Sequence, residues 1–117
     1  MDPAGLSLFV FGIYLGVIGA GFLIIPNVIL PIFRFEKTNE VWIRIMGLLI
    51  VLLAYYYINA AVHDMPDFYW ATCWARFAVL ACFAILVALK KAKPMLLLFG
   101  LVDAAGAVWT LVALVTA

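Results

Sequence analysis

Charge is scarce in this chain of 117 residues. Lysine, arginine, aspartate and glutamate together make up 11% of it, whereas they make up about a quarter of a typical soluble domain. Hydrophobic residues account for 70%, and the mean hydropathy is +1.26. This composition excludes an ordinary water-soluble globular domain. The formal net charge of +1 also gives no reason to expect a nucleic-acid partner.

Several other features are missing. The apolar runs lack the alternation of a transmembrane β-strand, so the chain is predicted to be all-α. The two cysteines, Cys73 and Cys82, lie on opposite sides of one expected helix and too far apart for a disulfide. The lone histidine has too few carboxylates around it to make a metal site, and no cofactor is predicted. The N-terminus lacks the basic region and cleavage site of a secretory signal, so we expect the first span to remain.

Long apolar segments are what the sequence does contain. A spanning helix needs about 20 residues, so four spans and their connections account for nearly the whole chain, as one transmembrane domain over 1–117. The prediction is an up-down four-helix bundle with spans at about 6–25, 40–62, 68–89 and 95–116. Prolines, aromatic residues and charges in the connection over 26–39 favour a position among the lipid headgroups.

The basic residues predict the orientation. The basic residues near the connections all fall on the side of the membrane that holds the first and third connections. This side is expected to be cytoplasmic. Both termini and the acidic turn at Asp64 and Asp67 are then expected on the outer, periplasmic side. The basic residues counted are Arg34, Lys37, Arg44, Lys90, Lys91 and Lys93.

Small residues mark faces where helices can pack closely in lipid. One stripe lies on the first span and another on the fourth. The pattern has two interpretations, which are packing inside one bundle and a homo-oligomer or larger membrane complex assembled through these faces. The residues are Gly12, Gly16, Gly19, Gly100 and Ala104.

Two charges interrupt the last two spans. Arg76 lies about 13 Å inside the third span from its outer end, and Asp103 lies about 17 Å from the same surface. An isolated charge at this depth costs several kcal/mol. We therefore expect Arg76 and Asp103 to form an intramembrane ion pair.

Other polar residues share faces with this pair at helical spacing, and they predict a polar pocket in the outer half of the bundle. Intramembrane ionisable residues commonly mark functional sites, but a structural network that fixes helix register is an equal alternative. The residues expected to line the pocket are Tyr55, Asn59, Thr72, Arg76, Asp103, Trp109 and Thr110.

A longer set of residues resembles a family of small four-helix inner-membrane proteins of bacteria whose function is uncharacterised. The resemblance implies a multi-pass protein of the inner membrane, and it implies no reaction. It rests on Trp42, Ile43, Arg44, Gly47, Tyr55, Tyr56, Thr72, Arg76, Leu98, Phe99, Gly100, Asp103, Gly106, Trp109 and Thr110.

Three functions are compatible with these patterns. The first is a non-enzymatic protein whose pocket binds a membrane lipid or another amphipathic molecule, with Arg76 at its polar head and Trp109 and Tyr55 along its apolar part. The second is a structural or assembly subunit that packs through the glycine stripes. The third is a membrane enzyme, such as an isomerase, that uses Asp103 as an acid or base.

Overall fold

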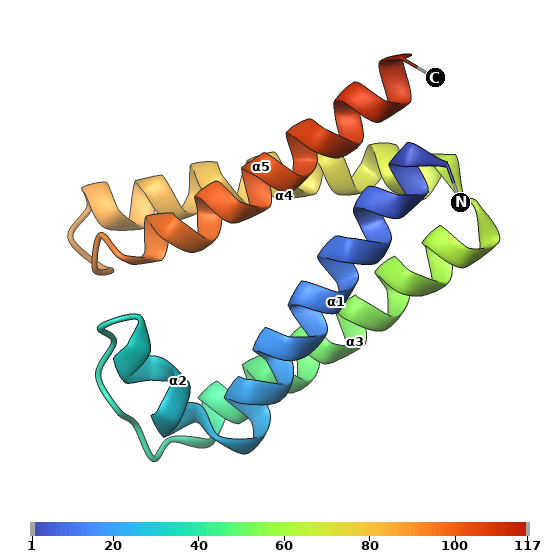
Figure 1. The fold of residues 1–117 in the computed structure, drawn as a ribbon. Coiled ribbons are helices and arrows are strands. Elements are labelled where there is room, and N and C mark those ends of the chain that lie inside the picture. Colours follow the sequence, from blue (N-terminus) through green and yellow to red (C-terminus); the bar gives the residue numbers. More distant parts are fainter. Residues whose placement is uncertain (1, 117) are drawn as a thin grey trace. The chain divides into compact units, whose positions relative to one another are not determined.

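The computed structural model describes residues 2–116, and this part of the chain contains five helices and no strand (Figure 1). Four of the helices have 21 to 23 residues and are apolar enough to cross a membrane. The four long apolar helices expected from the sequence are therefore present, with ends within three residues of those expected. The helices are α1 (Pro3–Ile24), α2 (Pro26–Ile32), α3 (Val41–His63), α4 (Pro66–Ala88) and α5 (Leu96–Thr116).

The chain divides into two compact units. The first, here called the α1–α3 unit, is Phe9–Asn59. The second, here called the α4–α5 unit, combines Met1–Leu8 with Ala60–Ala117. The single domain expected from the sequence stays a prediction.

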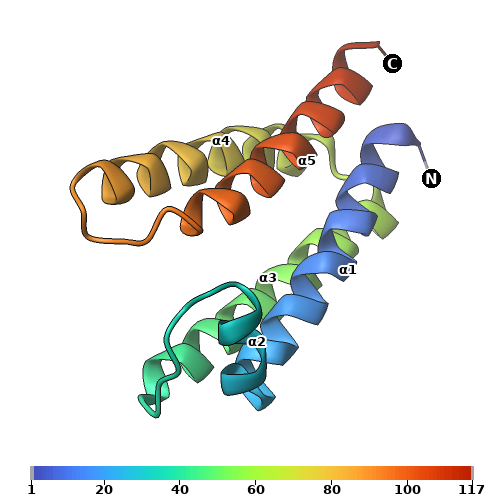
Figure 2. The ribbon, with the colours of Figure 1, turned by 60° about the vertical axis from the view of Figure 1, so that its left-hand side comes forward.

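Glycines bring the two long helices of the α1–α3 unit together as antiparallel neighbours (Figure 2). A Cβ on Gly19 would lie 2.9 Å from the carbonyl oxygen of Gly47, and a Cβ on Gly47 would lie 2.5 Å from the backbone nitrogen of Leu23. Both distances are shorter than any side chain permits. A Cβ on Gly12 would also be too close to its neighbour, at 2.8 Å from Cγ1 of Ile58. A Cβ on Gly16, in contrast, would make an ordinary 3.7 Å contact with Ala54. The stripe on α1 thus packs within the chain.

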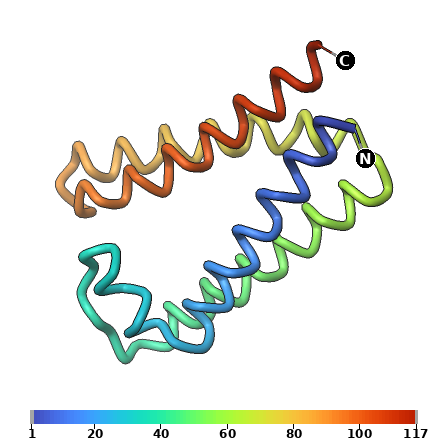
Figure 3. Tube along the Cα trace, in the orientation of Figure 1, coloured from blue at the N-terminus to red at the C-terminus, as the bar shows by residue number. Residues whose placement is uncertain are grey.

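A short helix, α2, occupies part of the connection that the sequence placed among the headgroups, and no helix was predicted there. Pro26 provides its first residue, which suits a residue that lacks an N–H donor. The helix folds back so that Ile29 lies against Gly21. After it, the backbone N–H of Thr38 donates to Oδ1 of Asn27 at 2.9 Å, which closes the loop traced in Figure 3.

In the α4–α5 unit, α4 and α5 are antiparallel neighbours (Figure 1). Gly100 meets Leu80, where an added Cβ would lie 3.2 Å from the Cα atom. Ala104, expected beside it in the packing stripe, is half-buried. Nearer the other end of α4, the thiol of Cys73 donates to the carbonyl oxygen of Ala107 at 3.7 Å.

Three helices end on a residue with positive φ, and none of these residues is glycine. They are Arg34, Asp64 and Lys90, with φ of 61°, 49° and 58°. In each case the next N–H donates to a carbonyl five residues back, as in the bond from Lys91 to Leu86. This is the Schellman arrangement. It gives each helix a fixed end at a conformational cost of about 1 to 2 kcal/mol for a residue that has a Cβ.

Candidate functional site

Polar side chains from three helices meet in the interior of the α4–α5 unit. Ser7 comes from the first turns of α1, Thr72 and Arg76 come from α4, and Thr110 comes from α5. All four are buried, with Arg76 only 2% exposed and Thr110 fully enclosed. We call these four residues the Arg76 cluster.

The guanidinium of Arg76 donates hydrogen bonds to threonine oxygens. Its Nη2 donates to Oγ1 of Thr110 at 2.9 Å and to Oγ1 of Thr72 at 3.1 Å, and its Nε donates to the carbonyl oxygen of Thr72 at 3.2 Å. Because Thr72 is one helical turn before Arg76, the arginine side chain runs along its own helix and reaches α5 at Thr110. Arg76 thus cross-links α4 and α5 from a position near the middle of α4.

The hydroxyls of Thr110 and Ser7 lie 2.6 Å apart. Thr110 also donates to the carbonyl of Gly106, and Ser7 donates to the carbonyl of Ala4. Each hydroxyl has a single hydrogen, so only two of these three hydrogen bonds can form at one time. The bond between the two hydroxyls therefore alternates with the bond to Gly106 or the bond to Ala4. This link ties the start of α1 to α5.

Asp103 is half-buried on α5, two turns before Thr110. It interacts electrostatically with Arg76, but within residues 2–116 no hydrogen bond joins the two side chains. The direct ion pair therefore stays a prediction. The hydrogen bonds described for the guanidinium go to Thr72 and Thr110.

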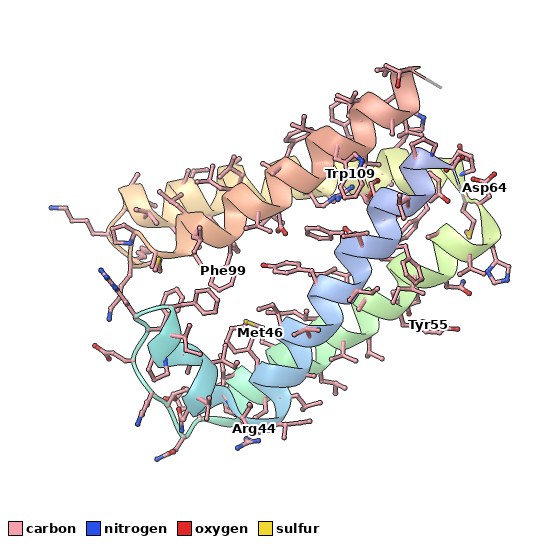
Figure 4. The ribbon with its side chains drawn as sticks, in the orientation of Figure 1. Arg44, Met46, Tyr55, Asp64, Phe99 and Trp109 are labelled. Carbon is pink, nitrogen blue, oxygen red and sulfur yellow. The ribbon has the colours of Figure 1, made fainter. Side chains whose placement is uncertain are left out.

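Three more residues were expected in the pocket, namely Tyr55, Asn59 and Trp109, and their place in it stays a prediction. Tyr55 is 63% exposed, and its side chain extends away from α1 (Figure 4). Tyr55 and Asn59 both belong to the α1–α3 unit. Trp109 lies beside Thr110 in sequence but is 43% exposed, so it faces the outside of the helix pair rather than its interior.

Sequence reasoning missed Ser7. The only signal for it was a single serine in a first span without charged residues. In lipid, such a hydroxyl finds a partner either on its own helix or on a neighbour. Here it does both, through Ala4 and Thr110.

Arg44 has a different role from the Arg76 cluster. Its Nη1 donates to the carbonyl oxygens of Leu23 and Ile24, at 2.7 and 3.2 Å. These carbonyls lie at the end of α1, where Pro26 interrupts the backbone hydrogen bonding. Arg44, labelled in Figure 4, therefore caps α1 from the start of α3.

Four apolar helices of this length are typical of a multi-pass membrane protein, and this is the class to which the fold points. Comparison with family models, curated proteins and solved structures finds no match. The function therefore has to be argued from the residues of the chain itself.

Proposed function

We propose that this chain is a four-span, up-down membrane protein that binds the polar head of an amphipathic molecule at the Arg76 cluster. The observation that carries the proposal is the burial of Arg76, a permanent cation, among the hydroxyls of Thr72 and Thr110. A charge within a spanning helix costs several kcal/mol, and such residues usually serve a function.

The guanidinium of Arg76 limits the chemical class of the ligand's head group. The planar fork of a guanidinium matches the oxygens of a carboxylate or phosphate and binds them with two parallel hydrogen bonds. The ligand would therefore carry a carboxylate or phosphate at its head and an apolar tail. The hydroxyls of Thr72 and Thr110 accept hydrogen bonds from Nη2 of Arg76. Ligand oxygens can take their place at little cost, because each hydroxyl can both donate and accept and can then donate to the ligand.

Mass spectrometry of the protein extracted in a mild detergent tests this proposal. We expect the wild-type protein to retain a small acidic amphiphile, Arg76→Gln to lose it, and Arg34→Gln to keep it. Arg34 is a matched control because it is an exposed arginine in the connection. Circular dichroism shows whether each variant keeps its helices. A wild-type protein without a bound molecule, or retention by folded Arg76→Gln, would refute the binding function.

A second candidate function is a structural or assembly subunit. It is favoured by the bond between Ser7 and Thr110, since the cluster ties three helices together through its own groups. In this case Arg76→Gln would lower the stability of the protein, and no ligand would be found on the wild type. The two measurements therefore separate the candidates.

The orientation is part of the proposal. We place both termini and the turn at Asp64 outside, and the lysines between α4 and α5 in the cytoplasm of a bacterial cell, with the chain in the inner membrane. Single cysteines at positions 67 and 91, in a chain lacking Cys73 and Cys82, test it in whole cells. An impermeant maleimide should label position 67 and spare position 91, and the opposite pattern would invert the topology.

A further inference from the structure

A hollow lies at the turn between α4 and α5. It is open on its outer side and has a volume of about 420 Å³, which is within the range of about 300 to 1,000 Å³ found for small-molecule sites. Its lining combines three exposed lysines with a small apolar floor. The lining residues are Val87, Lys90, Lys91, Ala92, Lys93 and Pro94.

The segment that forms this turn carries charge of one sign. No aspartate or glutamate occurs between Asp67 and Asp103, so the whole segment that forms the turn contributes only positive charge at this end. Three ammonium groups so close together repel one another. An anion held between them would relieve this repulsion, whereas a neutral ligand would not.

The backbone holds the lysines in place. Lys90 has φ of 58°, and the N–H of Lys91 donates to the carbonyl oxygen of Leu86 at 2.9 Å. This cap fixes two of the lysine Cα atoms against the end of α4. At the other side of the turn, the N–H groups of Leu96 and Leu97 already donate to Lys93 and Pro94. An anion would therefore be bound by lysine side chains rather than by the start of α5.

The position of the turn identifies the anion. Both α4 and α5 are long and apolar enough to cross a membrane, so their connection lies where the hydrocarbon ends and the lipid phosphates begin. Clusters of basic residues beside a spanning helix attract anionic lipids. We propose that the hollow binds the phosphate of an anionic lipid headgroup through Lys90, Lys91 and Lys93. This proposal is independent of the Arg76 cluster.

Native mass spectrometry of the full chain in a neutral detergent tests the site, with phosphatidylglycerol as the probe and phosphatidylcholine as the neutral comparison. The test variant is Lys90→Gly with Lys91→Gln. Glycine adopts positive φ without strain, so this variant removes two charges and keeps the cap. The matched control is Arg34→Gly with Lys37→Gln, which alters the other positive-φ basic residue and the nearby exposed Lys37.

We expect the wild type and the control to prefer phosphatidylglycerol. The test variant should bind it about 30-fold more weakly, because it lacks two of the lysines. Equal losses in the test variant and the control would overturn the proposal, because charge alone would then explain binding. A wild type with no preference would also overturn it. Displacement of the lipid by millimolar inorganic phosphate would show that free phosphate, rather than a headgroup, is the ligand.

Discussion

The two units associate their helices by different chemistry. In the α1–α3 unit, Gly19 and Gly47 let two backbones touch. In the α4–α5 unit, Arg76 and Thr110 join two helices through buried hydrogen bonds. Helices in lipid gain little from burying apolar area, so both close packing and polar bonds are used to hold them. The contrast shows that one short chain combines the two.

The largest effect is expected from Gly47→Ala. Its Cβ would lie 2.5 Å from the backbone nitrogen of Leu23 and 2.6 Å from the carbonyl oxygen of Gly19, so α1 and α3 would have to separate. Overpacking of this kind costs about 1 to 3 kcal/mol or more. Unfolding by sodium dodecyl sulfate in mixed micelles, followed by circular dichroism, measures the loss.

Gly16→Ala is the matched control, because its Cβ would make an ordinary contact of 3.7 Å with Ala54. We expect no loss of stability. Equal losses in the two variants would mean that the contact between Gly19 and Gly47 does not hold these helices together.

The next largest loss of stability is expected in the α4–α5 unit. Thr110→Val keeps the shape of the side chain and removes the oxygen that accepts from Arg76 and meets Ser7. We expect a loss of about 1 to 2 kcal/mol in the free energy of unfolding, since a charged donor is left with fewer acceptors. The same micelle titration measures it.

Thr116→Val provides the comparison. Its hydroxyl is exposed and donates only to the carbonyl of Val112, so its loss should change stability little. If Thr116→Val cost as much as Thr110→Val, the buried hydrogen bonds would not be what distinguishes this unit.

A smaller effect isolates the link between Ser7 and Thr110. A double-mutant cycle with Ser7→Ala and Thr110→Val should give a coupling free energy of about 0.6 kcal/mol, the average for hydrogen bonds between membrane helices. Strictly additive losses would show that the 2.6 Å contact adds nothing beyond each hydroxyl's bond to its own helix.

An effect of similar, small size is expected at the cap of α1. Arg44→Gln removes the cation that contacts the carbonyls of Leu23 and Ile24. A cation at a helix end contributes about 0.3 to 1 kcal/mol. Hydrogen exchange in the last turn of α1 should become faster, while exchange in α4 and α5 stays unchanged. Unchanged exchange at the end of α1 would exclude the capping role.

Much of the site could not be read from the sequence. The buried, helical positions of Arg76, Thr72 and Thr110 follow from spacing, and the structure brings these three together. The choice of partner does not follow, because it depends on how each helix is rotated about its axis. A rotation by one residue is about 100°, enough to exchange Thr110 for another side chain. Ser7 was missed for the same reason.

Residue type alone determined that this chain forms four apolar helices, because the cost of placing a polar group or a bare peptide in lipid is local to each residue. Proline positions likewise set where α1 ends and where α2 and α4 begin. Only the tertiary structure decided that Gly47 faces Gly19, that Arg76 donates to threonines, and that three lysines share a hollow. Each of these depends on distances between segments, which the packing of whole helices sets.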